Sequence, residues 1–492
     1  MTATEPAGFY IDGRWSDPTT QQRIEVIEAS TGRSIDSVPE AAEADVDLAV
    51  GAARRAFDEG EWSTWSPQAR SKAIHSLADA LDERAAATAH AVSTQNGMPI
   101  SISSATESVI PATLLRYYAE LATQLPSEEH RAGFAGGTTI VRKEPIGVVA
   151  AIAPWNFPQT LTFFKLAPLL AAGCTVVVKP SPETVLDSYI LAEAISASDI
   201  PDGVINIITG GREIGAYLVA HPGIDKVAFT GSTAAGRAIG EVCGRLIRRA
   251  TLELGGKSAS IILDDADLPS LLEQFFAATL MNNGQTCYLG TRVLAPRSRY
   301  SETVDILTDF ARSLTVGNAL DSATQIGPLA TANQQQRVQG YIAKGVADGG
   351  RVTTGGRRPV DHGDGWFVEP TIFADVDNSH TIAREEIFGP VLAVIPYSNV
   401  DEAIAIANDS DFGLGGTVWT SDEQRGLDVA RRVDTGSIGV NNYALDFGSP
   451  FGGVKASGLG RELGQEGLAS YQKTKSIYLT SNTPESIDRA TR

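Results

Sequence analysis

A cysteine and a glutamate stand in settings that suit a nucleophile and its base. Cys287 ends the run Asn-Asn-Gly-Gln-Thr-Cys, where small and amide residues follow an apolar helical stretch at 275–281. A thiol so placed can be reached by a substrate, although a lone cysteine is more often a small core hydrophobe. Glu253 lies between Leu252 and Leu254, and this apolar setting should raise the pKa of its carboxyl until it can take a proton near neutrality. Each feature is weak alone, but together they predict covalent catalysis by a thiol with a carboxylate base.

An asparagine could stabilise the negative charge that such a reaction develops. Asn156 stands in the run Pro-Trp-Asn-Phe-Pro at 154–158, directly after a predicted strand at 147–152. An amide in a proline-bounded loop can donate to an oxyanion, although a loop asparagine is more often a turn former. Asn156 is thus a candidate oxyanion donor whose role the local sequence leaves open.

Two further turns could hold a phosphate-bearing cofactor. No Gly-x-Gly-x-x-Gly follows a predicted strand in this region, and the run Phe-Thr-Gly-Ser-Thr at 229–233 stands there instead. Gly231 permits a tight turn, and Ser232 opens a helix whose free N–H groups can face a pyrophosphate. Lys179 and Glu183 follow another strand, where a lysine and a carboxylate can bond the hydroxyls of an adenosine ribose. A capped turn and a charged loop are the plainer interpretations of these two segments.

The elements that must position these residues form two series. Apolar positions at helical spacing predict a helical region at 43–95. Short apolar runs, each followed by a helical pattern, then predict parallel strands in two α/β domains, at 147–152, 174–179, 204–208 and 226–230, and at 258–263, 291–294 and 391–395. Such sheets bind ligands at the carboxyl ends of their strands. The boundary between the domains falls at 253–257, which would place Glu253 at a cleft.

Two segments are expected to lie outside both sheets. Residues 129–145 and 474–480 resemble isolated strands, which often pair with a neighbouring subunit. The tail after Ser481 is polar and expected to be loose.

Composition excludes several classes of function. The 492 residues are 42% apolar, enough for two or three domains with a large core. A net charge of −19 without a basic stripe argues against nucleic-acid and membrane partners. Three separated cysteines and six scattered histidines favour neither a disulfide framework nor a metal site. The N-terminus lacks the pattern of a secretory signal, and the apolar stretch at 161–178 is interrupted by Lys165, Pro168 and Gly173. We therefore expect a cytoplasmic protein.

Taken in order, seven motifs give a far more specific signal than any one of them. They are the runs at 154–158, 179–183, 229–233, 252–257, 284–287, 386–390 and 450–453. In this order the chain resembles the NAD(P)-dependent aldehyde dehydrogenase superfamily over almost its whole length. The resemblance implies an α/β protein with two Rossmann-like parallel-sheet domains and a small β oligomerisation arm, assembled as a homodimer or homotetramer. The implied parts are a dinucleotide-binding domain at 1–121 and 144–253, a catalytic domain at 254–450, and the arm and tail at 122–143 and 470–492.

The resemblance also implies roles for single residues. Cys287 would attack the aldehyde carbon to give a thiohemiacetal, whose oxyanion is held by the Asn156 amide and the Cys287 N–H. After hydride transfer to the nicotinamide, Glu253 would activate the water that releases the acid. Lys165 is expected to be a further catalytic residue, with Cys287, Asn156 and Glu253. The implied cofactor residues are Ile152, Pro154, Trp155, Lys179, Ser181, Glu183, Gly211, Phe229, Gly231, Ser232, Leu254, Glu386 and Phe388.

The substrate pocket implied by the resemblance is largely apolar. Its wall consists of Phe157, Leu161, Phe164, Thr286, Tyr288 and Phe451. This lining favours medium-chain, terpenoid or aromatic aldehydes. Arg292 is the nearest cation that could recognise a charged substrate, and it could equally be a structural arginine.

One position departs from the family pattern. Many members that prefer NAD carry a glutamate three residues after the cofactor lysine, and here that position is Pro182. Glu183 stands one position later, so we expect NAD as the cofactor, with NADP possible. Two other functions are weighed against this one. A CoA-acylating relative would generally lack the glutamate at Glu253, and a catalytically silent protein would not need Cys287 and Asn156 as well.

Overall fold

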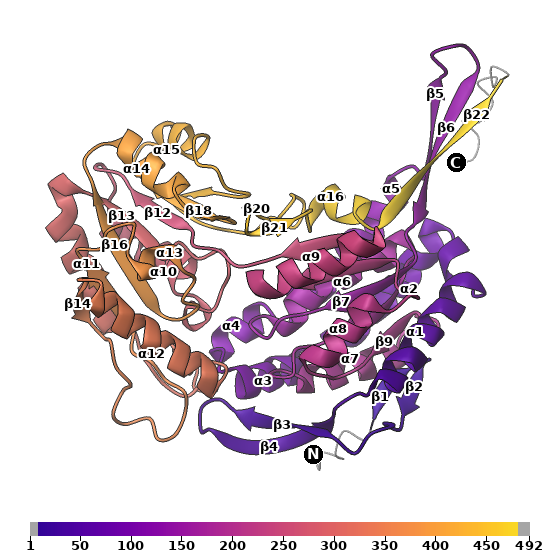
Figure 1. Cartoon of the computed structure of the whole chain (residues 1–492), viewed down its shortest axis with the longest axis horizontal. Helices are drawn as coiled ribbons and strands as arrows, with labels where there is room; N and C mark the ends of the chain where they lie inside the picture. Colours follow the sequence, from indigo (N-terminus) through magenta and orange to yellow (C-terminus); the bar gives the residue numbers. More distant parts are fainter. Residues whose placement is uncertain (1–7, 481–492) are drawn as a thin grey trace.

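The computed structural model describes residues 8–480 of the chain, which form two α/β lobes and a projecting arm (Figure 1). The first lobe holds an eight-stranded sheet in the order β2-β1-β9-β8-β7-β10-β11-β21. The strands are β1 (Phe9–Ile11), β2 (Arg14–Ser16), β7 (Val148–Ile152), β8 (Thr175–Lys179), β9 (Ile205–Ile207), β10 (Lys226–Thr230), β11 (Arg249–Glu253) and β21 (Gly458–Leu459). The five central strands are parallel and mostly buried, as apolar runs such as Val-Val-Ala-Ala-Ile predict.

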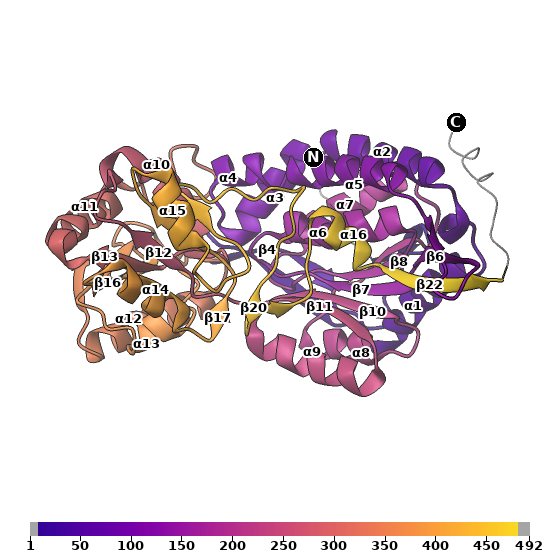
Figure 2. The ribbon, with the colours of Figure 1, turned by 90° about the horizontal axis from the view of Figure 1, so that it is seen from above.

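Helices cover both faces of this sheet (Figure 2). One face packs against α2 (Pro67–Asp82), α5 (Ile110–Gln124), α6 (Pro158–Ala172) and α7 (Leu186–Ser196). The other packs against α1 (Glu43–Asp58), α8 (Arg212–Ala220) and α9 (Thr233–Leu246). The lobe also contains α3 (Ala85–Asn96), α4 (Ile100–Ala105) and the hairpin of β3 (Arg23–Glu28) and β4 (Arg33–Pro39). The predicted helical region is therefore confirmed.

The second lobe is built on a seven-stranded sheet in the order β14-β15-β16-β13-β12-β18-β19. The strands are β12 (Ala259–Ile262), β13 (Arg292–Pro296), β14 (Arg351–Thr354), β15 (Thr371–Ala374), β16 (Val391–Tyr397), β18 (Gly416–Trp419) and β19 (Gly439–Val440), and all but β14 run parallel. Its helices are α10 (Leu272–Thr279), α11 (Tyr300–Ser313), α12 (Ala332–Ala347), α13 (Thr381–Arg384), α14 (Val400–Asn408) and α15 (Glu423–Ala430). The two predicted parallel sheets are thus confirmed.

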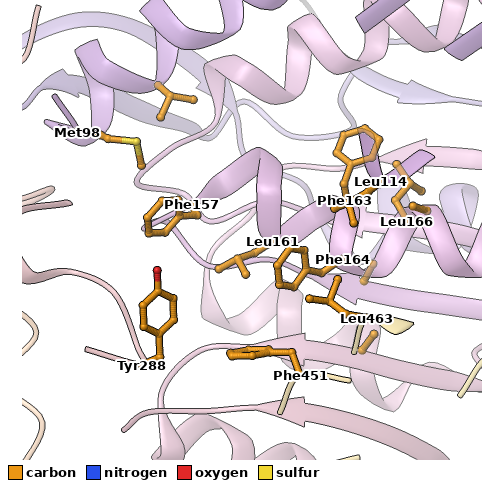
Figure 3. Close-up of a cluster of buried hydrophobic side chains, with 14 of the residues drawn as sticks. Met98, Leu114, Phe157, Leu161, Phe163, Phe164, Leu166, Tyr288, Phe451 and Leu463 are labelled. Atoms are coloured by element: carbon orange, nitrogen blue, oxygen red, sulfur yellow. The ribbon is translucent and has the colours of Figure 1, made fainter. Parts of the chain in front are cut away.

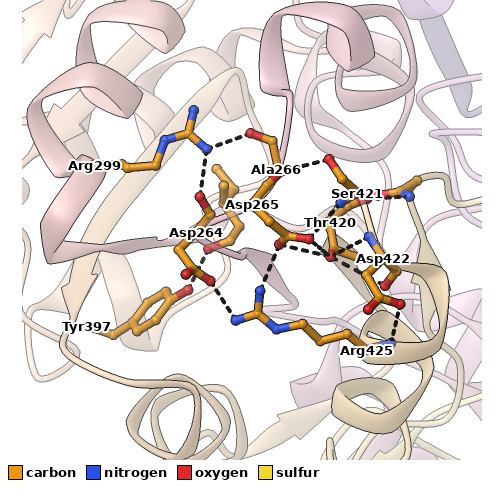
Figure 4. A network of polar contacts seen from close by, with 11 residues as sticks. Asp264, Asp265, Ala266, Arg299, Tyr397, Thr420, Ser421, Asp422 and Arg425 are labelled. Carbon is orange, nitrogen blue, oxygen red and sulfur yellow. Dashed lines mark hydrogen bonds and ion pairs between the residues drawn. The ribbon is translucent and has the colours of Figure 1, made fainter.

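A polar network joins the carboxyl ends of β12 and β18 to the helices beside them (Figure 4). Arg425 on α15 pairs with Asp264 at 2.5 Å and with Asp265 at 3.0 Å. Thr420 also donates to Asp265, and Arg299 donates to the carbonyl of Asp264. The network therefore fastens the carboxyl ends of these two strands, whereas Cys287 precedes the amino end of the neighbouring strand β13.

After the second lobe, the chain returns to the first. The short pair β17 (Phe412–Gly413) and β20 (Val454–Lys455) precedes β21, which lies antiparallel to β11 with Gly458 opposite Glu253. Helix α16 (Gly464–Ala469) then leads to the arm, a sheet in the order β22-β6-β5 formed by β5 (Glu128–Ala132), β6 (Thr138–Pro145) and β22 (Gln472–Leu479). The expected strands outside the two main sheets are confirmed. The loose tail predicted after Ser481 lies outside the described residues.

No helix within residues 8–480 is long and apolar enough to cross a membrane.

Candidate active site

Glu253 is the last residue of β11, and its side chain is buried. Within residues 8–480 neither carboxylate oxygen makes a regular hydrogen bond, although the Gly453 N–H lies close enough to favour the charged form. The returning chain can pass this close because Gly452 has no side chain: a Cβ there would lie 2.6 Å from Glu253 Oε1. Burial, and next the Glu462 carboxylate, hold the pKa of Glu253 well above its usual range. The expected rise in the pKa is confirmed.

Cys287 follows a tight turn that only certain residue types form easily. Asn282, Asn283 and Gly284 have φ angles of 52°, 60° and 74°, and asparagine and glycine tolerate this left-handed region best. A Cβ on Gly284 would lie 2.2 Å from the carbonyl oxygen of Gly389. The motif therefore encodes the turn that presents the thiol.

The thiol of Cys287 is half-buried and lines a cavity of about 230 Å³. Burial, then the carboxylates of Glu386 and Glu253, raise the pKa of Cys287. The other two cysteines, Cys174 and Cys243, are buried. The raised pKa favours the neutral thiol, so a base would assist Cys287 as a nucleophile.

Asn156 lies on the loop between β7 and α6, directly against the thiol turn. Its Nδ2 donates to the carbonyl of Gln285 at 2.9 Å, and its own carbonyl accepts from Asn282 Nδ2 at 2.8 Å. Asn96, from the end of α3, donates to the carbonyl of Trp155 on the same loop. These bonds fix the Asn156 amide beside Cys287, although the two residues come from different lobes.

Lys165 is fully buried on α6 and does not line the cavity. Its Nζ donates to Thr230 Oγ1 at 2.6 Å and forms an ion pair with Glu462 Oε1 at 2.8 Å. The Lys165 ammonium lowers the pKa of Glu253 while the Glu462 carboxylate raises it. Lys165 therefore acts on the base through its charge and not by touching the reacting atoms.

The structure brings together part of the residue set expected for the cofactor. The 230 Å³ cavity is lined by Pro154, Trp155, Asn156, Thr230, Gly231, Ser232, Leu254, Gly255, Cys287, Gln334, Arg337, Glu386 and Phe388. Ile152 and Phe229 pair across β7 and β10 behind this lining. Lys179, Ser181, Glu183 and Gly211 lie further along the carboxyl edge of the sheet, at the ends of β8 and β9. The residues expected for the cofactor thus follow the carboxyl ends of the strands of the first sheet, and Cys287 lies at one end of this row.

Sequence reasoning missed several cavity residues. Gln334 and Arg337 come from α12, a polar helix that carries no recognisable motif. Gln334 Nε2 donates to the carbonyl of Phe388 at 2.7 Å, and Arg337 Nη2 donates to the carbonyl of Glu386 at 2.6 Å. Thr230 was also missed, although it directly precedes Gly231. Only the packing of α12 against the 386–390 loop places its two side chains in the cavity.

The lining suits a dinucleotide. Gly231 and Ser232 open α9 at the cavity, with the Ser232 hydroxyl accepting from the Ala235 N–H, so the helix N-terminus can face a pyrophosphate. Glu386 Oε1 accepts from the Gly256 N–H at 2.9 Å, which leaves its other oxygen for a ribose hydroxyl. The Trp155 and Phe388 rings meet edge to face at 5.2 Å and form an apolar wall. The residues present therefore fit the group that the sequence predicts.

All the residues expected for the substrate pocket except Thr286 gather in an apolar cluster (Figure 3). Phe157, Leu161 and Phe164 come from the start of α6, and the Tyr288 hydroxyl points toward Phe157. The Phe164 and Phe451 rings lie perpendicular at 6.3 Å. Thr286 Oγ1 donates to the carbonyl of Met281 at 3.2 Å, within the thiol turn.

A second cavity of about 150 Å³ borders this cluster. It is lined by Ser437, Ile438, Gly439, Tyr443, Ala444, Leu445, Asp446, Ser449, Pro450 and Phe451. The Tyr443 ring stacks on Tyr288 at 4.3 Å, and its hydroxyl bonds Ser437 Oγ at 2.6 Å. Burial is the main cause that raises the pKa of Tyr443. Tyr443 and Phe451 line the second cavity and also belong to the apolar cluster, so this cavity adjoins the expected substrate wall.

Arg292 is structural. It is 1% exposed, and its guanidinium donates to the carbonyls of Lys257, Ile406 and Ala407 at 2.8 to 2.9 Å and to Asn378 Oδ1 at 3.0 Å. Since every one of these donors is committed inside the protein, Arg292 is not free to bind a charged substrate.

Comparison with known proteins decides the family. The model of the aldehyde dehydrogenase family matches residues 15–477. The chain belongs to the aldehyde dehydrogenase family. The predicted enzyme class, an NAD(P)-dependent aldehyde dehydrogenase that forms the carboxylic acid, and the predicted fold are thereby confirmed.

Individual members of the family are similar over nearly their full length. A geranial dehydrogenase of Castellaniella defragrans is 52% identical over 471 residues, covering 96% of this chain and 98% of the relative. A crystal structure of a Mycobacterium tuberculosis aldehyde dehydrogenase with NAD+ has a TM-score of 0.95 at 46% identity, covering 97% of this chain and 99% of that one. A Pseudomonas syringae aldehyde dehydrogenase mutant with NAD+ and octanal has a TM-score of 0.91 at 37% identity, covering 97% of both chains.

Proposed function

We propose that this aldehyde dehydrogenase oxidises extended apolar aldehydes of the terpenoid or medium-chain class with NAD, through an acyl thioester on Cys287. The observation that carries the proposal is a thiol and an amide at one cavity, with a buried carboxylate next to a residue of the cavity wall. The Cys287 thiol and the Asn156 amide, which is held against the thiol turn, line the cavity, and the buried carboxylate of Glu253 directly precedes Leu254, which also lines it. A nucleophile, an oxyanion donor and a base of raised pKa are what thioester chemistry requires.

The residues act in sequence on the aldehyde carbon. Glu253 takes the proton of the Cys287 thiol, and the sulfur attacks the carbonyl carbon to form a thiohemiacetal. The Asn156 Nδ2 and the Cys287 N–H donate to the oxyanion that develops. When bound, the oxidised nicotinamide supplies the acceptor for the hydride that leaves this carbon.

The same carboxylate serves the release of product. Glu253 first releases to solvent the proton that it took from the thiol. It then accepts a proton from water, the resulting hydroxide adds to the thioester carbon, and the C–S bond breaks to leave the acid and the Cys287 thiolate, to which Glu253 returns the proton. Glu462 favours the neutral form of Glu253 and Lys165 favours its charged form, so the ion pair sets the balance that lets one group accept and return protons.

The substrate class is supported by the apolar lining and by the relatives. None of the six residues of the expected wall is charged; Thr286 and Tyr288 carry its hydroxyls, and the Tyr443 ring stacks on Tyr288. Similarity to a geranial dehydrogenase supports a terpenoid aldehyde, and similarity to a protein crystallised with octanal supports a medium-chain one. A wall of this kind holds a hydrocarbon tail by burying it.

We also propose the domain division that the resemblance implies, with the dinucleotide-binding domain at 1–121 and 144–253 and the catalytic domain at 254–450. The arm at 122–143 and 470–492 would pair with a second copy in a homodimer or homotetramer. This pairing is supported by β5, an edge strand of the arm sheet whose five residues are all exposed, because an exposed edge strand can pair with another chain. The three free cysteines are consistent with a cytoplasmic location.

The test follows reduced-nicotinamide absorbance on mixing the protein with geranial, octanal or benzaldehyde, each with NAD and with NADP, in the absence of CoA. Turnover with geranial or octanal and NAD is the expected result, and Cys287→Ala should abolish it while leaving NAD binding intact. Turnover by Cys287→Ala would refute the thioester route. Activity that appears only when CoA is added would replace hydrolysis by acyl transfer to CoA.

A further inference from the structure

Near the proposed adenosine end of the dinucleotide site lies a carboxylate that comes from a distant part of the chain. We propose that Glu40 makes this enzyme discriminate against NADP. It would take the role of the glutamate that many NAD-preferring members carry at the position of Pro182. The proposal rests on the proposed function, since it assumes that Lys179 lies at the adenosine ribose.

Glu40 and Lys179 flank one peptide group. Lys179 is 5% exposed, and its Nζ donates to the carbonyl of Gly210 at 2.6 Å. Glu40 Oε1 accepts from the N–H of the next residue, Gly211, at 3.1 Å. Burial lowers the pKa of Lys179 to about 8, while the carboxylates of Glu183 and Glu40 favour its charged form. The lysine that would bond the ribose thus has a fixed negative charge beside it.

Glu40 is held firmly by its own backbone. It follows β4, its N–H donates to the carbonyl of Gln22 at 2.9 Å, and the N–H of Ala41 donates to the carbonyl of Thr209 at 2.9 Å. Its side chain is partly buried. The edge of the hairpin is therefore tied to the segment after β9, and the Glu40 charge is fixed in position before any cofactor arrives.

Glu183 is a weaker candidate for the same role. Its side chain is exposed, and its carboxylate accepts from the Ser181 hydroxyl within its own loop. An exposed charge on a loop is screened by solvent, so it repels an anion less than a partly buried and anchored carboxylate does.

The Glu40 carboxylate also accepts from an N–H, that of Gly211, which would otherwise be free to donate to a phosphate. Gly211 is the N-cap residue that directly precedes α8, and free N–H groups at a helix N-terminus are a natural site for an anion. Because the Glu40 carboxylate already accepts from the Gly211 N–H, a 2′-phosphate in this place would meet a like charge and lose that donor. A 2′-hydroxyl would instead donate to the carboxylate. The geometry therefore favours NAD over NADP on two counts.

The test measures the dissociation constants of NAD and NADP for the whole protein without aldehyde, from quenching of tryptophan fluorescence, since Trp155 lines the cavity. Glu40→Gln keeps the acceptor for Gly211 and removes only the charge, whereas Glu40→Ala also frees the N–H. Glu59→Gln, at the far end of α1, makes the same change in net charge and is the matched control.

We expect Glu40→Gln to lower the NADP-to-NAD ratio of dissociation constants about tenfold at low salt. This is the effect of one carboxylate on a phosphate dianion across roughly 6 Å of water. Glu40→Ala should lower the ratio further, and binding of NAD should change less than about threefold. A ratio unchanged in both Glu40 variants, or changed equally in Glu59→Gln, would overturn the proposal. A ratio of dissociation constants that changes in Glu183→Gln but in neither Glu40 variant would also overturn the proposal. Wild-type protein that binds neither nucleotide would refute the proposed function itself.

Discussion

Replacing Asn156 by alanine tests the oxyanion assignment most directly. The Asn156 amide and the Cys287 N–H are the two donors proposed for the oxyanion, so the substitution removes one of two. The side-chain donors of Gln334 and Arg337 cannot compensate, because they donate to the carbonyls of Phe388 and Glu386. Loss of one such donor costs about 10²–10³ in kcat, equivalent to roughly 3–4 kcal/mol. The loop itself should stay in place, since Asn282 still donates to the carbonyl of residue 156.

The assay compares kcat, the KM for aldehyde and the dissociation constant of NAD in wild type and Asn156→Ala. Asn206→Ala is a matched control, because Asn206 is a buried asparagine on β9 that also donates to carbonyls, those of Val176 and Gly203, at 3.2 and 2.8 Å. Both variants lose buried hydrogen bonds and should fall in Tm, but only Asn156→Ala should lose kcat. A kcat within threefold of wild type for Asn156→Ala, or equal losses in both variants, would refute the reasoning.

Three further predictions concern the thiol, the base and the ion pair. Glu253→Gln should slow turnover about 10²–10⁴-fold and let an acyl-enzyme build up that intact-protein mass spectrometry detects; wild-type turnover would contradict it. Because the pKa of Cys287 is raised, the thiolate fraction of the free protein should still increase through pH 9. Alkylation of Cys287 by iodoacetamide, measured against Cys287→Ala, should therefore rise about tenfold per pH unit from pH 7, and a plateau near the ordinary thiol pKa of about 8.5 would argue against this. Lys165→Met should destabilise the protein by about 3–5 kcal/mol by leaving Glu462 buried and unpaired, and Lys165→Met/Glu462→Gln should recover most of the lost Tm. Equal melting temperatures for the single and double variants would show that the pair contributes no such energy.

Local sequence predicted the strands and the helices, and it placed the thiol among small and amide residues after a helical stretch. The run at 148–152 is apolar throughout, and a strand buried on both faces needs no other signal. Two asparagines and a glycine stand shortly before Cys287, and the left-handed backbone that the structure shows at these positions explains why these residue types stand there. Glu253 could be singled out as a base because its two neighbours are apolar.

Partners from distant parts of the chain could not be predicted in the same way. The sequence suggested a raised pKa for Glu253, but the second cause of that rise is Glu462, which only the returning chain brings near. Gln334 and Arg337 reach the cavity because α12 packs against the 386–390 loop. Arg292 could have been a substrate ligand or a structural residue until its hydrogen bonds were visible.

The sequence by itself determined this protein's residue chemistry and its local backbone: a thiol on a left-handed turn, a glutamate among leucines and a run of parallel strands. The tertiary structure alone decided which charges meet. Glu40 caps Gly211 beside Lys179, and Glu462 pairs with Lys165 near Glu253. The physical reason is range. Backbone preference and hydrophobic periodicity act over a few residues along the chain, whereas burial and Coulomb forces act through space between groups that only the folded chain brings together.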